Sequence, residues 1–166
     1  MESSAVRQYL SATAERMAQG RLEIQSQQDG APGTLVGERT VKVSEFPVQL
    51  SVCVATFEEI TLTSVREYRR AIDSYGQVLR RRRPVRSRRG TCAVAALVSE
   101  RVDPAVFSAV KNKPTSYGVV IVPAVVDLGA RRLHIPGNNP IFGIAMWRGV
   151  RQQAHDFLPE PREVLG

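Results

Sequence analysis

The most concentrated chemistry in this sequence is a run of arginines near its middle. Residues 80–89, the arginine tract, read RRRRPVRSRR, with seven arginines and no acidic residue. The chain has 23 Lys and Arg against 16 Asp and Glu, so its formal charge is +7 and the remainder of the chain is formally neutral. A partner attracted by charge therefore meets this tract and not a diffuse basic surface.

Arginine suits phosphate, because the guanidinium keeps its charge and donates two parallel hydrogen bonds to an oxyanion. Binding of this kind releases counterions, depends on salt and is largely blind to base sequence. Arg69 and Arg70 lie on the helix expected just before the tract. The sequence therefore predicts a non-enzymatic protein that binds RNA or DNA phosphate through Arg69, Arg70, Arg80, Arg81, Arg82, Arg83, Arg86, Arg88 and Arg89.

Other interpretations of the tract remain open. No aromatic residue interrupts it, so it lacks a stacking platform for single strands, and the sequence matches no helix-turn-helix, zinc-finger or RNA-recognition signature. The tract could instead engage an acidic protein or a membrane surface, act as a targeting signal, or be a solvated loop with no direct role. The main alternative is a structural, assembly or adaptor subunit that docks an acidic protein or self-associates as a homo-oligomer.

Nucleophilic cysteine chemistry has little support in the sequence. Cys53 and Cys92 both lie in apolar, strand-like runs, where a buried and inert thiol is usual. Two cysteines this far apart indicate neither a disulfide framework nor a structural zinc site. We expect both to be core residues of a protein in a reducing compartment.

No motif for a metal, a cofactor or catalysis is present either. His134, His155 and Asp127 have no metal-ligand spacing, and the glycine-containing turns lack both the P-loop lysine and the G-x-G-x-x-G spacing. We therefore expect no cofactor and no metal. An enzyme would need titratable groups in one cleft, and the candidates are Glu38, Asp127 and His134.

Hydrophobic periodicity and turn residues predict the elements that would present the tract. Ser4 is an N-cap candidate for a first helix that ends near residue 19. Ser64 and Glu67 have the form of a capping box and predict a helix that ends before Pro84. Residues 92–99 are continuously apolar, which is typical of a central strand buried on both faces. Pro123 interrupts the apolar run 117–128 and indicates a sheet edge, a bulge or two shorter strands.

These elements predict a single α/β (α+β) domain over residues 1–158. Its expected order is α-βββ-α-β-α-ββ-α, with a mixed sheet of five to six strands and helices packed on it. An arginine-rich loop is expected at residues 80–90, and residues 159–166 are expected to be a peripheral tail. Asn139-Pro140 predicts the start of a last helix that ends near residue 158.

The order helix, three strands, helix, strand resembles the core of the restriction-endonuclease-like nucleases. The resemblance implies an acid on the second strand and Glu-x-Lys on the third, which in that family bind the metal and the scissile phosphate. Glu38 could take the first place. The third strand, however, reads Ser51-Val52-Cys53-Val54-Ala55 and has no Glu-x-Lys. The resemblance therefore implies a binding scaffold whose active site has been lost.

The length of the apolar stretches and the first residues of the chain bear on where the protein is expected in the cell. The longest apolar stretches, at residues 92–98 and 119–126, are much shorter than the roughly 20 residues that cross a bilayer. The first residues lack the apolar core of a secretory signal. We expect no membrane span and a cytoplasmic protein, with a nuclear location as the alternative in a eukaryote.

Overall fold

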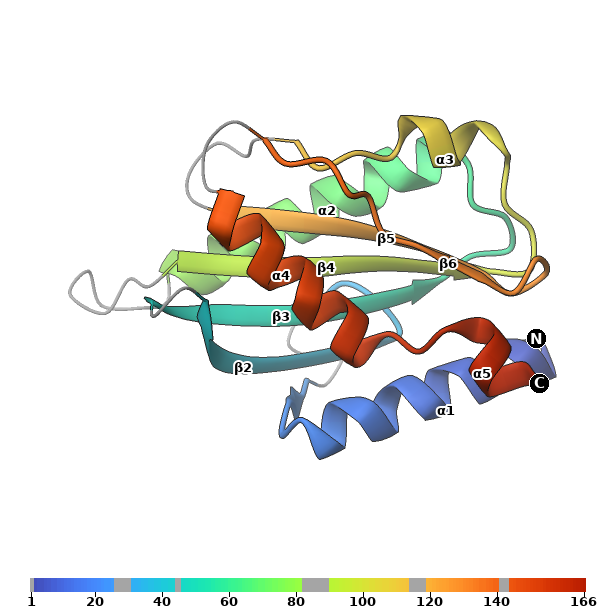
Figure 1. The fold of residues 1–166 in the computed structure, drawn as a ribbon, viewed down its shortest axis with the longest axis horizontal. Helices are drawn as coiled ribbons and strands as arrows, with labels where there is room; N and C mark the ends of the chain where they lie inside the picture. Colours follow the sequence, from blue (N-terminus) through green and yellow to red (C-terminus); the bar gives the residue numbers. More distant parts are fainter. Residues whose placement is uncertain (1, 26–30, 44–45, 82–89, 114–118, 141–143) are drawn as a thin grey trace.

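The chain forms one mixed six-stranded sheet covered by helices on both faces (Figure 1). The computed structural model describes residues 2–25, 31–43, 46–81, 90–113, 119–140 and 144–166. The strands are β1 (Glu23–Ile24), β2 (Leu35–Val43), β3 (Phe46–Thr56), β4 (Gly90–Ser99), β5 (Val119–Asp127) and β6 (Arg132–His134). The helices are α1 (Ser4–Gln19), α2 (Leu62–Arg81), α3 (Ala105–Ala109), α4 (Ile144–Phe157) and α5 (Pro161–Leu165). The predicted α/β fold class is confirmed.

The strands lie in the sheet in the order in which they occur in the chain. β1, β2 and β3 are antiparallel neighbours, β3, β4 and β5 run parallel, and β6 returns antiparallel to β5. Parallel neighbours need a crossover, and α2 and α3 supply the two crossovers. Both helices pack on the same face of the sheet, and α1 and α4 cover the other face. None of the described helices is both long enough and apolar enough to cross a membrane.

β4 is the centre of the core, as the continuous apolar run predicts. Every residue of this strand after Gly90 is buried. Cys92 and Val94 pack into the core beneath α1 and α4, whereas Ala93 and Leu97 pack into the core beneath α2. A strand that is apolar on both faces is stable only when both faces are covered, which explains the three layers.

Pro123 is a buried residue of one continuous strand, at a position where that strand has a neighbour on one side among the described residues. On one side β5 pairs with β4 along its whole length, and Pro123 lies opposite Ala95. On the other side β6 pairs only with Val125, Val126 and Asp127. The proline therefore lies where the described part of the chain supplies no second strand neighbour, which is the edge position at which a sheet tolerates proline.

The start of α2 differs from the sequence prediction. The N-cap is Thr61 and not Ser64: the Thr61 hydroxyl accepts from the Ser64 backbone N–H at 3.2 Å, and the Ser64 hydroxyl accepts from the Thr61 backbone N–H at 2.8 Å. This is a capping box in which serine replaces the usual glutamate as the third helical residue, so the N-cap predicted from the Ser64–Glu67 pattern is wrong.

Two other helices also start at a different residue from the one predicted. The cap of α1 is Ser3, one residue before Ser4. The last long helix is described from Ile144, after the predicted start at Asn139-Pro140.

We expect Thr61→Ala and Ser64→Ala each to lower the free energy of unfolding by about 1 kcal/mol, because each removes a partner of an N-terminal N–H group. Glu67→Ala is the control and should change it by less than about 0.5 kcal/mol, since Glu67 is exposed and takes no part in the cap. Urea denaturation measures all three. A larger loss in the Glu67 variant than in the other two would contradict the reassigned cap.

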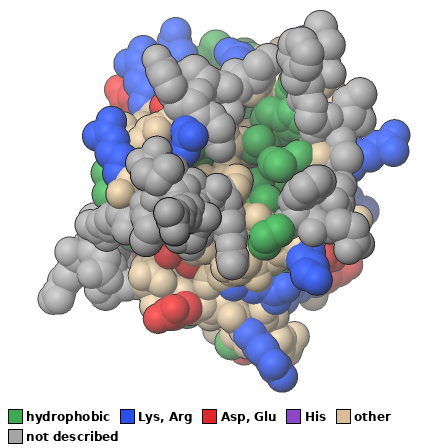
Figure 2. Space-filling model, turned by 90° about the vertical axis from the view of Figure 1, so that its left-hand side faces the viewer, with side chains coloured by type: hydrophobic (Ala, Val, Ile, Leu, Met, Phe, Trp, Pro, Cys, Tyr) green, Lys and Arg blue, Asp and Glu red, His purple; other side chains and the backbone are tan. Residues whose placement is uncertain are grey.

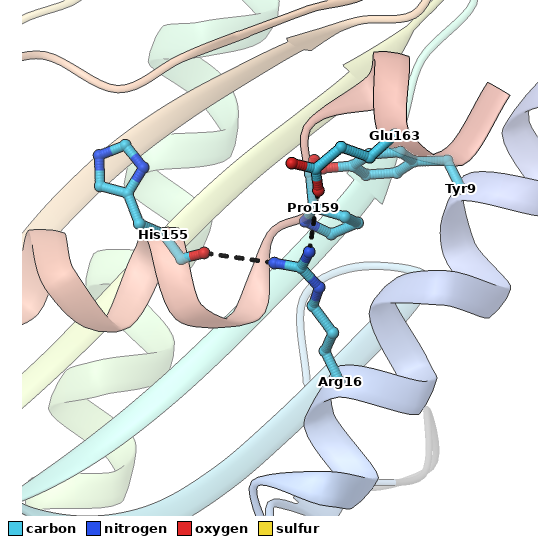
Figure 3. A network of polar contacts seen from close by, with 5 residues as sticks. All are labelled: Tyr9, Arg16, His155, Pro159 and Glu163. Atoms are coloured by element: carbon cyan, nitrogen blue, oxygen red, sulfur yellow. Dashed lines mark hydrogen bonds and ion pairs between the residues drawn. The ribbon is translucent and has the colours of Figure 1, made fainter. Parts of the chain in front are cut away.

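The two ends of the chain lie side by side (Figure 1), and polar contacts join them (Figure 3). The buried Tyr9 hydroxyl of α1 donates to the Pro159 carbonyl at 2.9 Å, and burial raises the pKa of Tyr9, so the hydroxyl stays protonated. Arg16 of α1 donates to the His155 carbonyl at 3.5 Å and pairs with the Glu163 carboxylate at 3.2 Å. Residues 159–166, expected to be a peripheral tail, thus include the helix α5, which packs on α1.

Tyr9→Phe should lower the free energy of unfolding by about 1–3 kcal/mol, because it leaves the Pro159 carbonyl buried without its donor. Glu163→Gln should change stability by less than about 1 kcal/mol, because both side chains of the Arg16–Glu163 pair are partly exposed to solvent, which screens their attraction. Chemical denaturation of both variants tests this order. Equal stability of Tyr9→Phe and the parent chain would show that the tail is not held by this contact.

Candidate nucleic-acid interface

α2 carries the four predicted phosphate-binding arginines that the structure describes. Arg69 and Arg70 lie in its middle, and Arg80 and Arg81 form its last two residues. The helix lies close to the sheet, since a Cβ added at Gly76 would be 3.0 Å from Cγ1 of Val119 on β5. The other five predicted arginines lie outside the described residues: Arg82, Arg83, Arg86, Arg88 and Arg89.

Arg70 and Arg81 stand on the side of α2 that faces away from the sheet. They are eleven residues apart, which is about three turns, so the two side chains lie in one row along the helix about 16 Å apart. Tyr68, Ile72 and Tyr75 occupy the opposite, buried side, and both arginines are exposed. We call Arg70 and Arg81 the outer arginine pair. Arg81 also gains from its place at the helix C-terminus, where the macrodipole favours a positive charge.

The arginine tract is attached at one end of the sheet. α2 ends at Arg81, and the described chain resumes at Gly90, which lies opposite Val48 on β3. Thr91, the next residue of β4, lies opposite Val119 at the start of β5. Figure 2 views this end, where described Lys and Arg side chains lie around the margin and hydrophobic side chains lie nearer the middle. The tract therefore connects the C-terminus of α2 to the start of β4.

Arg69 occupies a different environment from its neighbour Arg70. Its side chain is half-buried, and Nη2 donates to the Lys113 carbonyl at 3.4 Å. Burial lowers the pKa of Arg69, and the nearby Asp73 carboxylate offsets part of this effect. Arg69 lines an apolar pocket between α2 and the segment that follows α3. The predicted set thus divides between the outer face of the helix and this pocket.

Arg80 lies one position before Arg81 and is half-buried. It is eleven residues from Arg69, so these two arginines form a second row along the flank of α2. Three further cations line the same pocket as Arg69 and do not belong to the predicted phosphate-binding set: Arg66, Lys111 and Lys113. Of these three residues, only Arg66 could have been found from a sequence pattern, since it lies on the polar face of the predicted helix. The two lysines come from a segment after α3 that has no periodic pattern.

The three groups that an enzyme would need do not converge. Glu38 lies on β2 and His134 on β6, with three strands between them, or about 19 Å at the usual strand spacing. Asp127 accepts the Ala130 N–H at 2.9 Å in the turn after β5, and the His134 ring packs edge-on against Phe107 at 5.5 Å between centroids. Within the described ranges, no three His, Cys, Asp or Glu side chains lie close enough together to hold a metal ion.

Glu38 takes part in a polar cluster on the face of the sheet beneath α2. Its carboxylate accepts a hydrogen bond from the Tyr75 hydroxyl and one from the Ser51 hydroxyl, the latter at 3.4 Å. Ser51 lies directly opposite Glu38 in the β2–β3 ladder. The contacts join two strands to the C-terminal half of α2. They give Glu38 a structural role at the place where the nuclease resemblance implies a metal ligand.

Comparison with protein-family models, curated proteins and solved structures finds no significant match for this chain. The likeness to the nucleases therefore rests on the element order alone.

The two cysteines are buried free thiols, as their apolar surroundings predict. Burial raises the pKa of Cys92 to about 12. Burial also raises the pKa of Cys53, and the charge of Glu38 adds to this effect. A thiolate is the reactive form, so neither sulfur is prepared for nucleophilic attack near neutral pH.

A thiol reagent at pH 8 should therefore modify neither cysteine of the folded protein, because a pKa of about 12 leaves about one thiol in ten thousand ionised. Reactivity should rise as the pH approaches 12, and both cysteines should react at once in denaturant. Intact-mass spectrometry counts the modified residues. Rapid modification of Cys53 or Cys92 in the folded chain would contradict this account.

Proposed function

We propose that this protein binds the phosphate backbone of RNA or DNA through the outer arginine pair of α2 and the arginine tract that follows it. One observation carries the proposal: Arg70 and Arg81 lie in one row on the exposed side of a continuous helix whose last residue enters the tract. A helix positions two cations, and five more arginines of the tract follow in the sequence.

The contact is electrostatic and carries no base preference of its own. Each phosphate that an arginine neutralises releases condensed counterions, which makes binding favourable and strongly salt-dependent. The helix positions the complex, because phosphate contacts fix orientation without reading sequence. The work that the protein does on the nucleic acid is binding and not bond cleavage.

Arg69 is not part of this surface, because its guanidinium lies on the pocket flank of α2.

The free thiols Cys53 and Cys92 are in keeping with a reducing compartment, which is the cytoplasm or, in a eukaryote, the nucleus.

Self-association is the competing proposal. β1 pairs only with Gly37 and Glu38, so the outer edge of β2 from Arg39 onward has no strand neighbour among the described residues.

The test measures binding of duplex DNA, single-stranded DNA and RNA between 50 and 200 mM salt. Arg70→Gln/Arg81→Gln should weaken binding to all three and lessen the slope of log K against log salt by up to about 1.8, or about 0.9 for each lost phosphate contact. Changing the seven tract arginines to glutamine should remove most of the binding.

Arg7→Gln/Arg162→Gln is the matched control, since it removes the same charge from exposed positions on α1 and α5. It should bind like the parent chain. Equal losses in the two double variants would show attraction to net charge alone. No binding at low salt, or tighter binding to polyglutamate of equal charge, would overturn the proposal in favour of self-assembly or an acidic protein partner, and sedimentation at two concentrations separates these.

A further inference from the structure

An apolar pocket of about 270 Å³ lies between α2 and α3, above β4 and β5. Ala95 and Leu97 of β4 and Ile121 and Pro123 of β5 line it, with Leu62 and Val65 of α2 beside them. Its volume is near the small end of the range for ligand pockets, about 300–1,000 Å³. The pocket is a feature of one face of the sheet and is separate from the outer arginine pair.

The hollow results from small side chains and a short helix. Ala95 and Pro123 are direct neighbours across the β4–β5 ladder, so two small residues lie side by side in the sheet. α3 has only five residues and covers little of this surface, and its last residue, Ala109, also lines the pocket. Leu62 lines the pocket although its residue is 38% exposed, so apolar surface is open to solvent there.

The charged residues that line the pocket all carry the same sign. Arg66 and Arg69 come from α2, and Lys111 and Lys113 come from the segment after α3. Among the described lining residues none is acidic. An apolar pocket lined by four cations favours a ligand with an apolar body and a negative end, because each part then meets its complement.

A buried amide clasp anchors the segment that carries the two lysines. Asn112 is 3% exposed and donates from Nδ2 to the carbonyls of Asn138, at 2.9 Å, and Pro136, at 3.0 Å. Asn138 donates back to the Asn112 carbonyl at 2.8 Å. Lys111 and Lys113 flank Asn112 in the chain, and both line the pocket although each is exposed. The clasp therefore anchors the backbone between the two lysines.

Arg69 is the cation best placed to hold the charged end of a ligand. Its guanidinium is half-buried, and the hydrogen bond that the described residues give it is the long one to the Lys113 carbonyl, at 3.4 Å. A guanidinium has five N–H donors in a planar fork that matches a carboxylate. Asp73 supplies a nearby negative charge, but no hydrogen bond joins it to Arg69 among the described residues. A ligand carboxylate would add hydrogen-bond acceptors for the donors of this partly buried guanidinium.

We propose that this pocket binds a small amphipathic carboxylate, with its apolar body over Ala95 and Pro123 and its carboxylate against Arg69. Lys111 and Lys113 add electrostatic attraction at the rim. The site requires none of the residues proposed for nucleic-acid phosphate, so either proposal can fail while the other stands.

Decanoate, below the concentration at which it forms micelles, is the probe for calorimetric titration of the full chain. It should bind at one site per chain, more tightly than decanol, which lacks the charge, and far more tightly than decylammonium, which reverses it. Arg69→Gln should weaken binding about tenfold to a hundredfold, the range expected for one charged hydrogen-bonded pair. Arg69→Lys should recover part of the affinity, because charge returns without the fork.

Arg70→Gln is the matched control: it removes the same charge from the next residue, which faces away from the pocket, and should bind decanoate like the parent chain. Ala109→Phe tests the cavity itself, since Ala109 is exposed on α3 and a phenyl ring there would fill the pocket without disturbing the core. This variant should abolish binding of decanoate and decanol alike. Thermal denaturation without ligand confirms that each variant is folded.

Several results would overturn the proposal. The first is the absence of any heat of binding with millimolar decanoate. The second is equal affinity for decanoate and decanol, and the third is an equal loss of decanoate affinity in Arg69→Gln and Arg70→Gln. Undiminished binding in Ala109→Phe would place the probe elsewhere. Tighter binding of decyl phosphate or of a mononucleotide that displaces decanoate would replace the carboxylate with a phosphate ligand.

The two proposals are tested separately by Arg70→Gln/Arg81→Gln. This variant should lose nucleic-acid binding and still bind decanoate.

Discussion

Burial of β4 on both faces is the constraint on which the rest of the structure depends. A strand with apolar side chains above and below the sheet must be covered twice, so helices are needed on both faces. Its parallel neighbours add a second requirement, because each parallel connection must cross over the sheet. α2 and α3 make these crossovers with the same hand, since they share one face while the strand order advances steadily. The opposite face is left to α1 and α4, and the contact of α1 with α5 brings the chain ends together.

The positions of the charged residues follow from this arrangement. α2 returns the chain from the far end of β3 to the start of β4, so its C-terminus must lie where the parallel strands begin. The arginine tract therefore begins at the end of the sheet and not above its middle. Because α2 buries one side, the same helix directs Arg70 outward and Arg69 toward the flank. Two neighbouring arginines thus have different surroundings, with solvent around one and an apolar pocket beside the other.

The pocket reflects the unequal lengths of the two crossover helices. α2 has 20 residues and α3 only five, so the covering of β4 and β5 is incomplete where α3 ends. Small side chains at Ala95 and Pro123 deepen the gap. The Asn112–Asn138 clasp then fixes the segment that supplies Lys111 and Lys113. At this pocket the packing is incomplete and the described charged residues that line it are all positive. These two features together are the physical basis for the ligand proposed above.

The sequence by itself determined the kinds of element and their order from the first helix to the last long helix, because apolar periodicity is a local property of the chain. The short helix α5 lies where only a tail was expected. The continuous apolar run of β4 and the burial of Cys53 and Cys92 could be predicted from neighbouring residues. For Pro123 the sequence left an edge, a bulge or two shorter strands open, and the strand pairing selected the edge. Boundaries were less certain: Thr61 and Ser64 cap α2 by a reciprocal contact that the Ser64–Glu67 pattern concealed. Only the tertiary structure decided that Glu38 and His134 lie on strands far apart, that Arg69 and Arg70 face different surroundings, and that Lys111 and Lys113 line the same pocket as Arg69. Those relations join segments distant in the sequence, and they depend on strand order and helix rotation, which no local pattern encodes.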